Sequence, residues 1–351
     1  MVRFNAPSIA AICPHLSKGF YIKMAQPLPP SPLTGDRIMA ADPSPLRKRP
    51  SIGLALGAGA ARGFAHIGVL RTLLARGLRP HIITGTSAGA IVGGFFVAGQ
   101  LEAFAEWSLG LTRRGVFTFL DISLSGSSLI GGERLARRLE AMIGRVRIET
   151  LETRFAAVAT EIATGHEVWL TRGRLFEALR ASYALPGILP PVHIGQRWLV
   201  DGALVNPVPV SAARALDARL VIAVNLNSDL YGRGSTIANH GFEESDDVIR
   251  PNPAAQHWLG LVGIERLLKR QLVGNVTRPG LSRVMVEAYN VMQDRITRAR
   301  LAGDPADIMI SPRLDRIGLF DFHRARDAIE LGAEAAERAL ETIDQTIAAL
   351  S

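Results

Sequence analysis

Ser87 lies in the pentapeptide Gly-Thr-Ser-Ala-Gly, residues 85–89, which has the form of a nucleophile turn. The apolar run 81–85 leads into it and the apolar run 88–99 follows, as a strand passing into a helix would do. Such a turn is sharp, and glycine relieves the close backbone contacts two residues before and after the serine. A serine that only caps the helix needs no flanking glycines. We therefore expect Ser87 to be a nucleophile, with Gly85 and Gly89 as the turn glycines.

A second glycine-rich turn, residues 57–63, also lies between an expected strand and an expected helix. A dinucleotide-binding turn is disfavoured, because Arg62 occupies the third glycine position and no Asp or Glu occurs between Ser51 and Leu101. A phosphate loop would need a Gly-Lys-Ser/Thr sequence, which is missing here. The turn therefore suits an oxyanion, and we expect the Ala58 N–H to be available to one. The candidate oxyanion or substrate-binding residues are Gly57, Ala58, Gly59, Ala60, Arg62 and Gly63, with Ala88 at the start of the next helix.

Arg62 itself has two interpretations of equal weight. A cation in the first turn of a helix faces the positive end of the helix dipole, so another interaction must offset that cost. Either Arg62 bonds to loop carbonyls and holds the shape of the turn, or it contacts a substrate anion such as phosphate.

Asp201 is the candidate base for Ser87. The histidines that follow Ser87 occupy no convincing position for a serine triad. Asp201 ends the apolar run 197–201, and Gly202 lets the chain turn at once, so we expect the carboxylate at the same sheet edge as Ser87. An ordinary Asp-Gly turn is the alternative. A carboxylate titrates near 4, so the base would need a dry pocket that raises its pKa.

The elements that must position these residues alternate along the chain. Strands are expected at 52–56 and 81–85, and helices at 63–77 and 88–99, with short connections. This order predicts an α/β fold of three layers, α/β/α, with a mostly parallel central sheet. Further strands are expected at 155–163, 167–171, 197–201, 220–226 and 306–311, and further helices at 134–144, 175–184, 209–218 and 324–350.

Composition narrows the class of protein. The chain has 351 residues, 48% of them hydrophobic, and a formal net charge of +8, which favours an anionic partner. Aromatic residues make up only 6%, without basic–aromatic interleaving, so nucleic acid is not expected as a partner. The single cysteine, Cys13, excludes an internal disulfide and indicates a reducing, cytoplasmic compartment. We expect neither a metal site nor an organic cofactor.

Three segments depart from the alternating pattern. Residues 1–50 are proline-rich and basic, which predicts a disordered leader ahead of a catalytic domain at 51–345. Residues 228–256 are polar and rich in turn formers, which predicts an exposed loop. Residues 257–300 are expected to form an amphipathic helical segment, and its first part, 257–274, either packs on the core or lies on an anionic bilayer. The uncharged span 82–101 is long enough to cross a membrane, but its glycines divide it into strand, turn and helix.

The runs "GLALGAGAARGFAHIGVL", "GTSAG" and "DGA" stand in this order, and together they resemble the patatin-like phospholipases, in particular the bacterial branch. The resemblance is specific over residues 52–225 and resumes at 306–332. It implies a Ser-Asp dyad without histidine, in which Ser87 is the nucleophile and Asp201 the base. It also implies that the turn at 57–63 is the oxyanion loop.

The expected activity is therefore that of a lipid acyl hydrolase, which cleaves acyl esters of phospholipids or lysophospholipids through an acyl-enzyme. The excess positive charge would hold such an enzyme peripherally on the inner face of an anionic membrane. Two alternatives remain: an acyltransferase that uses the same dyad, and a lipid-binding regulatory protein of the same fold without turnover.

Overall fold

The structure is a computed structural model and describes residues 50–119, 131–228, 274–275, 278–279 and 281–351. The chain divides into two units, residues 1–47 and 48–351, and the described residues all belong to the second. The leader predicted at 1–50 and the loop predicted at 228–256 therefore lie outside the described residues, except for Pro50 and Ser228. The helical segment predicted at 257–300 is described only from Gly274 onward, with gaps.

An eight-stranded sheet carries the candidate site. Along the chain its strands are β1 (Ile52–Leu56), β2 (Ile82–Thr86), β3 (Arg154–Glu161), β4 (Glu167–Leu170), β5 (Val192–Ile194), β6 (Arg197–Asp201), β7 (Leu220–Val224) and β10 (Ile308–Ile310). Followed from one hydrogen-bonded neighbour to the next, the strands come in the order β10-β7-β1-β2-β3-β6-β5, and β4 also pairs with β3. The strands from β10 to β3 run parallel, whereas β4 and β6 are antiparallel to β3, and β5 is antiparallel to β6. The predicted mostly parallel sheet is confirmed.

The register on β3 brings the ends of β2 and β6 together. β2 and β4 both pair with Val158, so they lie on opposite edges of β3. β4 and β6 both pair with Ala159, so β6 shares the edge of β2. Thr86, the last residue of β2, pairs with Val158, and Asp201, the last residue of β6, pairs with the next residue, Ala159. The two strands therefore meet end to end along one edge of β3.

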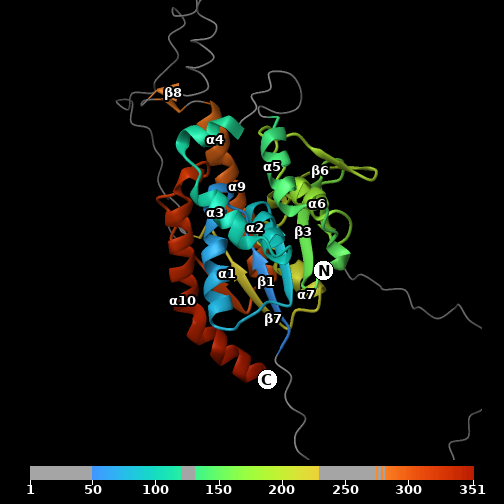
Figure 1. Cartoon of the computed structure of the whole chain (residues 1–351), viewed down its shortest axis with the longest axis vertical. Helices are drawn as coiled ribbons and strands as arrows, with labels where there is room; N and C mark the ends of the chain where they lie inside the picture. The colour runs from blue at the N-terminus through green and yellow to red at the C-terminus, as the bar shows by residue number, and fades with distance from the viewer. Residues whose placement is uncertain (1–49, 120–130, 229–273, 276–277, 280) are drawn as a thin grey trace, which may run out of the picture. The chain divides into compact units, whose positions relative to one another are not determined.

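Helices cover both faces of the sheet (Figure 1). One face packs against α1 (Ala65–Ala75), α2 (Ala88–Val97), α3 (Leu101–Leu109), α5 (Glu133–Ile143), α6 (Leu175–Ser182) and α10 (Ala325–Leu350). The other packs against α7 (Val210–Ala215) and the C-terminal end of α9 (Leu281–Gly303). The side chains alternate as strands require: Leu54 and Leu56 join the first core, and Ala55 joins the second. The predicted three-layer arrangement is confirmed.

Most predicted elements are present with small shifts at their ends. The uncharged span 82–101 contains β2, Ser87 and α2, and none of the described helices is both long and apolar enough to cross a membrane. The helices α3 and α4 (Arg113–Phe119) and the short strand β5 were not predicted. Within the segment predicted as helical, 257–300, a hairpin of β8 (Gly274–Asn275) and β9 (Arg278–Pro279) precedes α9, so the prediction was wrong for these residues. The remaining elements are the 3-10 turns η1 (Ala60–Phe64), η2 (Ile148–Thr150), η3 (Gly202–Leu204) and η5 (Phe322–Arg324).

α1 and α10 lie side by side (Figure 1) and approach at two glycines. A side chain at Gly68 of α1 would overlap the Ile329 carbonyl oxygen of α10. In return, a side chain at Gly332 of α10 would overlap the Ala65 carbonyl oxygen of α1. Because both contacts are to backbone atoms, no side-chain rotation can relieve them. α10 therefore packs directly on α1, the helix that follows the glycine-rich turn.

We expect Gly68→Ala to destabilise the protein by about 1–3 kcal/mol, since an added methyl group must push the two helices apart. Chemical denaturation monitored by circular dichroism measures the change. Gly303→Ala is the matched control, because nothing lies within contact distance of that position, and its effect should stay within about 0.5 kcal/mol. Equal stability of the two variants would contradict this account of the helix contact.

Candidate active site

Ser87 occupies a strained turn between β2 and α2. Its backbone angles are φ 55° and ψ −119°, a positive φ that non-glycine residues rarely adopt. A side chain at Gly85 would meet the backbone of Ala90, and one at Gly89 would overlap the Leu56 carbonyl oxygen, so both flanking positions require glycine. The Ser87 side chain makes no capping hydrogen bond to α2. The helix-cap interpretation of this serine therefore does not describe the geometry.

A second serine holds the turn in place. The Ser87 N–H donates to Ser182 Oγ at 2.9 Å, and Ser182 Oγ donates to the Val158 carbonyl oxygen of β3 at 2.6 Å. Ser182 ends α6 and is fully buried. An isolated serine near the end of a helix carries no sequence signal for such a bridge, so this residue was not predicted. Ser182 thus ties the backbone of Ser87 to the strand that also positions Asp201.

The Asp201 carboxylate lies against the Ser87 hydroxyl, which donates to Oδ2 at 2.6 Å. The other oxygen, Oδ1, accepts the Ala203 N–H at 2.8 Å, so the aspartate also caps the turn η3. The backbone of Asp201 is fixed as well: its N–H donates to the Ala184 carbonyl, and its carbonyl accepts the Thr160 hydroxyl. An ordinary Asp-Gly turn therefore does not describe this geometry fully, because the turn also holds the Asp201 carboxylate beside the Ser87 hydroxyl.

Close packing behind Asp201 explains the glycine that follows it. A side chain at Gly202 would overlap the Val158 carbonyl oxygen of β3. This carbonyl is the one that accepts the Ser182 hydroxyl. The aspartate turn and the serine bridge therefore converge on a single peptide of β3.

Burial sets the protonation of Asp201. Its side chain is 1% exposed, and desolvation raises its pKa to about 7, against the opposing hydrogen bonds from Ser87 and the Ala203 N–H. A carboxylate with this pKa is a much stronger base than an exposed one. A carboxylate that serves as the base for a serine needs such a rise in pKa, and the buried position of Asp201 supplies its cause.

No histidine lines the pocket within the described ranges. His66 lies beneath the glycine-rich turn, where its Nε2–H donates to the Gly57 carbonyl at 2.7 Å. Burial lowers the pKa of His66 to about 4, so its ring is neutral. His323 accepts a hydrogen bond from Arg113, and His240 and His257 lie outside the described residues. The described histidines therefore have structural or surface positions.

The glycine-rich turn offers fewer free N–H groups than the sequence analysis expected. The Gly57 N–H donates to the Val224 carbonyl, and the Ala58 N–H donates to the Pro207 carbonyl at 2.9 Å. The expectation that the Ala58 N–H is available was therefore wrong, because this end of the turn is bonded to the segment after β6. Beside Ser87, the N–H groups of Gly59, Ala60 and Ala88 border the pocket and have no backbone acceptor among the described residues.

Arg62 points away from the pocket. Its side chain is buried, and its Nε donates to the Ile317 carbonyl at 2.8 Å while Nη1 donates to Asn227 Oδ1 at 3.3 Å. Of its two interpretations, this geometry favours the one in which Arg62 holds the shape of the turn. Gly63 has a packing role, because a side chain there would overlap Ala88 Cβ. The turn can therefore lie directly against the start of α2.

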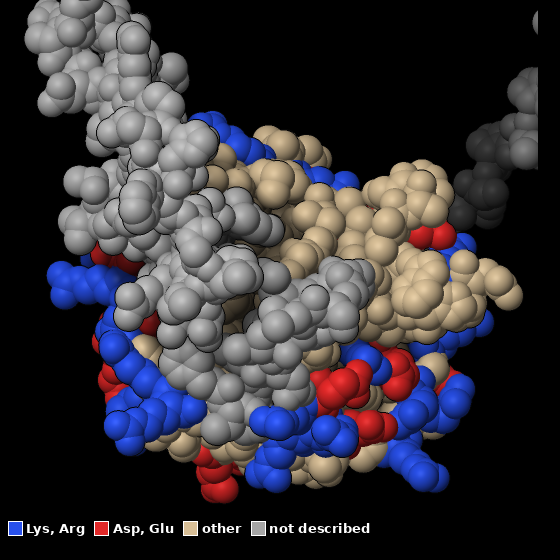
Figure 2. Space-filling model, turned by 90° about the horizontal axis from the view of Figure 1, so that it is seen from above, with Lys and Arg blue, Asp and Glu red and all other residues tan. Residues whose placement is uncertain are grey.

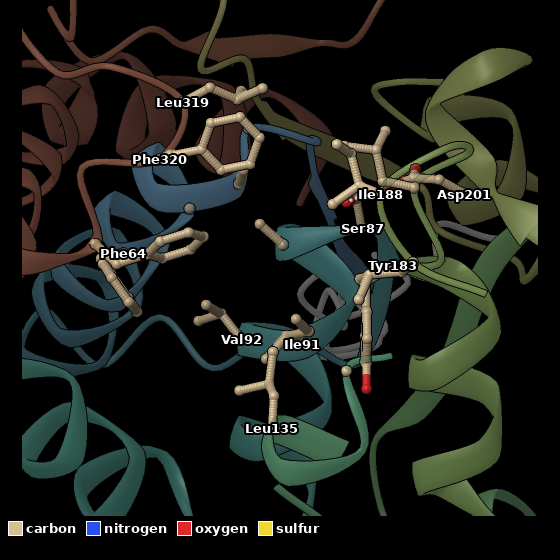
Figure 3. A pocket seen from close by; sticks show the side chains of 18 of the residues that line it. Phe64, Ser87, Ile91, Val92, Leu135, Tyr183, Ile188, Asp201, Leu319 and Phe320 are labelled. Carbon is tan, nitrogen blue, oxygen red and sulfur yellow. Dashed lines mark hydrogen bonds between the residues drawn. The ribbon is translucent and has the colours of Figure 1, made fainter. Parts of the chain in front are cut away.

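The pocket beside Ser87 is almost entirely apolar. It extends from Ser87 along α2, past Ile91 and Val92, towards Leu135 of α5 (Figure 3). Seen from above, the described surface next to the hollow is mostly uncharged, and charged side chains lie farther out (Figure 2). The other apolar lining residues include Phe64, Phe104, Trp107, Leu111, Val116, Leu139, Leu185, Ile188, Leu189, Leu319, Phe320 and Phe322. The site therefore combines a buried polar pair with space for a hydrocarbon chain.

The raised pKa of Asp201 predicts a pH-dependent stability difference. The folded chain retains this proton between about pH 4 and pH 7, whereas the unfolded chain, with an ordinary pKa near 3.9, has lost it. The contribution of Asp201 to the free energy of unfolding is therefore fully present below about pH 4, and it is lost as the pH rises through about 7. Asp201→Asn cannot ionise, so relative to wild type it should gain stability between pH 5 and pH 8, by on the order of a few kcal/mol at 1.36 kcal/mol per pKa unit.

Urea denaturation of both proteins at pH 5 and pH 8 measures this gain. The exposed Asp315, replaced by Asn, is the control and should show no such gain. A stability difference between wild type and Asp201→Asn that is the same at both pH values would show that burial does not raise the pKa of this carboxylate.

Comparisons with known proteins identify the family. A family model described as patatin-like phospholipase matches residues 54–214. An uncharacterized NTE family protein of Mycobacterium tuberculosis is 33% identical over 86% of this chain and 96% of its own length. The lysophospholipase NTE1 of Pyricularia oryzae is 27% identical over 80% of this chain and 18% of its length. Among solved structures, VipD from Legionella pneumophila matches with a TM-score of 0.43 at 14% identity, covering 83% of this chain and 67% of VipD.

The high coverage of the mycobacterial relative, together with the match to the family model, decides the assignment. The family model spans both Ser87 and Asp201, and it ends within α7. The chain belongs to the patatin-like phospholipase family, which supports a lipid hydrolase in the broad sense.

Proposed function

We propose that the protein is a serine-dependent lipid acyl hydrolase that cleaves acyl esters of phospholipids or lysophospholipids. Ser87 is the nucleophile and Asp201 the base of a two-residue catalytic machinery. The observation that carries the proposal is the 2.6 Å hydrogen bond from the Ser87 hydroxyl to a buried carboxylate with a pKa of about 7. A serine hydroxyl is a weak nucleophile until an adjacent base can take its proton.

Acylation begins when the Ser87 oxygen attacks the ester carbonyl carbon and its proton passes to Asp201. The carbonyl oxygen then becomes an oxyanion, which needs hydrogen-bond donors in fixed positions. The free N–H groups of Gly59, Ala60 and Ala88 border the pocket and can supply them. The N-terminus of α2 adds its positive dipole end at the same place. Each donor is a backbone group fixed by the turns around it.

Collapse of the tetrahedral intermediate breaks the bond to the leaving alcohol, and Asp201 returns the proton to that oxygen. Water then attacks the acyl-enzyme with Asp201 again as base, which releases the fatty acid and restores Ser87. Protons and electron pairs balance with these two side chains alone. The proposed reaction therefore draws on no metal or organic cofactor.

The apolar pocket supports a lipid as the substrate class. An acyl chain that enters along α2 would contact Ile91, Val92 and Leu135 and would leave water, at a gain of about 25 cal/mol per Å² of apolar surface. The name of the fungal relative, a lysophospholipase, agrees with this class. The net charge of +8 would favour peripheral contact with the anionic inner face of a membrane, which places the protein in the cytoplasm under this proposal.

Loss of either catalytic side chain should abolish hydrolysis. Ser87→Ala and Asp201→Asn should each lower kcat/KM for lysophospholipid by at least about a thousandfold, because they remove the nucleophile or its base. Fatty-acid release from a lysophosphatidylcholine panel measures the effect. Ser108→Ala, which removes a buried hydroxyl of α3 bonded to the Phe104 carbonyl, is the matched serine control and should keep activity. Turnover that survives in Ser87→Ala would refute the assignment of the nucleophile.

The base also sets the pH dependence of the reaction. Asp201 must be ionised to accept the serine proton, so kcat/KM should rise with pH, reach half its maximum near pH 7 and level off above it. Initial rates with a p-nitrophenyl ester between pH 5 and pH 9 give the profile. Full activity at pH 5 would mean that the base has an ordinary carboxylate pKa, and the proposed role of burial would then fail.

A further inference from the structure

Two polar side chains on the α9 side of the pocket have no role in the proposed mechanism. Apart from the Trp107 indole, the polar side chains that line this pocket in the described part of the chain are Ser87, Tyr183, Asp201, Tyr289 and Gln293. Tyr289 and Gln293 lie one turn apart on α9, so they share one face of that helix. Polar groups in an apolar pocket usually orient a ligand. This face of α9 therefore presents polar atoms where the rest of the pocket presents hydrocarbon.

The Tyr289 hydroxyl is buried and makes no hydrogen bond of normal geometry with the described residues. Burial raises its pKa well above the usual range, and the nearby charge of Asp201 adds to the rise, while a hydrogen bond with the Gln293 side chain that falls outside normal geometry opposes it. The phenol therefore keeps its proton at every working pH. The Tyr289 O–H therefore has no acceptor at normal hydrogen-bond geometry among the described residues and remains available to a ligand.

The fold places Tyr289 on the Asp201 side of Ser87. α9 packs against η3, the turn that directly follows Asp201. Gln293 Oε1 accepts a hydrogen bond from Asn227, which also donates to the Ala58 carbonyl, so α9 is connected to the glycine-rich turn. The acyl pocket extends in another direction, along α2. Tyr289 thus belongs to the α9 side of the pocket, next to the turn that follows Asp201.

We propose that Tyr289 donates a hydrogen bond to the leaving-group oxygen of the ester, an inference that rests on the proposed hydrolase function. The leaving oxygen must lie within reach of the proton on Asp201, which is the side where Tyr289 stands. As the carbon–oxygen bond breaks, its electron pair goes to that oxygen, which then takes the Asp201 proton. Tyr289 keeps its own proton and stabilises the developing negative charge through its hydrogen bond.

The test compares two esters of the same fatty acid: p-nitrophenyl dodecanoate and dodecanoyl lysophosphatidylcholine. The p-nitrophenolate ion is stable by itself, whereas the glycerol oxygen of the lysolipid needs a proton and a donor as it leaves. Tyr289→Phe should therefore lower kcat/KM for the lysolipid about tenfold more than for the aryl ester. The change should appear mainly in kcat, because the bond strengthens as charge develops.

Tyr183→Phe is the matched control. The Tyr183 hydroxyl is also buried without a normal hydrogen bond to the described residues, but it points away from Ser87 (Figure 3). The charges that act on it are Arg180, Glu133 and Glu177 rather than Asp201. Any effect on binding of the shared acyl chain cancels in the ratio of the two esters, so this variant should keep the wild-type ratio. The ratio is also independent of the fraction of folded protein.

The possible results distinguish a failure of the proposed hydrolase function from a failure of the role of Tyr289. A wild-type protein that cleaves neither ester overturns the proposed function, whatever Tyr289 does. A wild-type protein that cleaves both, with equal losses for both in Tyr289→Phe or with the same shift in Tyr183→Phe, overturns the role of Tyr289 alone. Cleavage of the aryl ester alone by wild type also overturns that role, because no glycerol oxygen would then be a leaving group.

Discussion

The arrangement of the site depends on one constraint, which is that β2 and β6 share an edge of β3 and meet there end to end. β2 ends beside Val158 and β6 beside Ala159, so the next residue of one strand faces the last residue of the other. Ser182 then fixes the Ser87 N–H to the same stretch of β3. A single strand therefore sets the separation of a serine and an aspartate that lie 114 residues apart in sequence.

The buried position of Asp201 at the end of β6 changes its pKa. A carboxylate at the edge of a solvated sheet would keep an ordinary pKa, but Asp201 lies under η3 and α9 at the end of an apolar pocket. Desolvation raises its pKa to about 7 at a cost to the stability of the ionised folded state. The strained backbone of Ser87 adds a further cost of order 1–3 kcal/mol. The packed sheet and the α1–α10 contact must offset both, so stability is given up where reactivity is gained.

Local sequence was enough to predict the turn at Ser87, because glycines at fixed positions and the change from strand to helix are visible without the fold. The same is true of the strand and turn at Asp201. The position of Asp201 beside Ser87 was predicted correctly, but the direction of its strand was not considered. β6 runs antiparallel to β3, and its last residue reaches Ser87 because β6 pairs with the part of the β3 edge just beyond the end of β2. Ser182 and the bonded N–H of Ala58 could not be predicted, because their partners are distant in sequence.

α9 shows why hydrophobic pattern alone fails near a polar site. It buries Asn290, Gln293, Asp294 and Thr297, while Val284, Val291 and Met292 are exposed. A pattern-based assignment would turn the apolar residues inward and so would miss Tyr289 and Gln293 at the pocket.

The most direct test of the central claim is a crystal structure of the protein after reaction with an alkyl fluorophosphonate, which mimics the tetrahedral intermediate. The account predicts a phosphorus atom bonded to Ser87 Oγ, with its phosphoryl oxygen within hydrogen-bond distance of the Gly59 and Ala60 N–H groups and its alkyl chain along α2. An adduct on another residue, or a phosphoryl oxygen turned away from the glycine-rich turn, would contradict it.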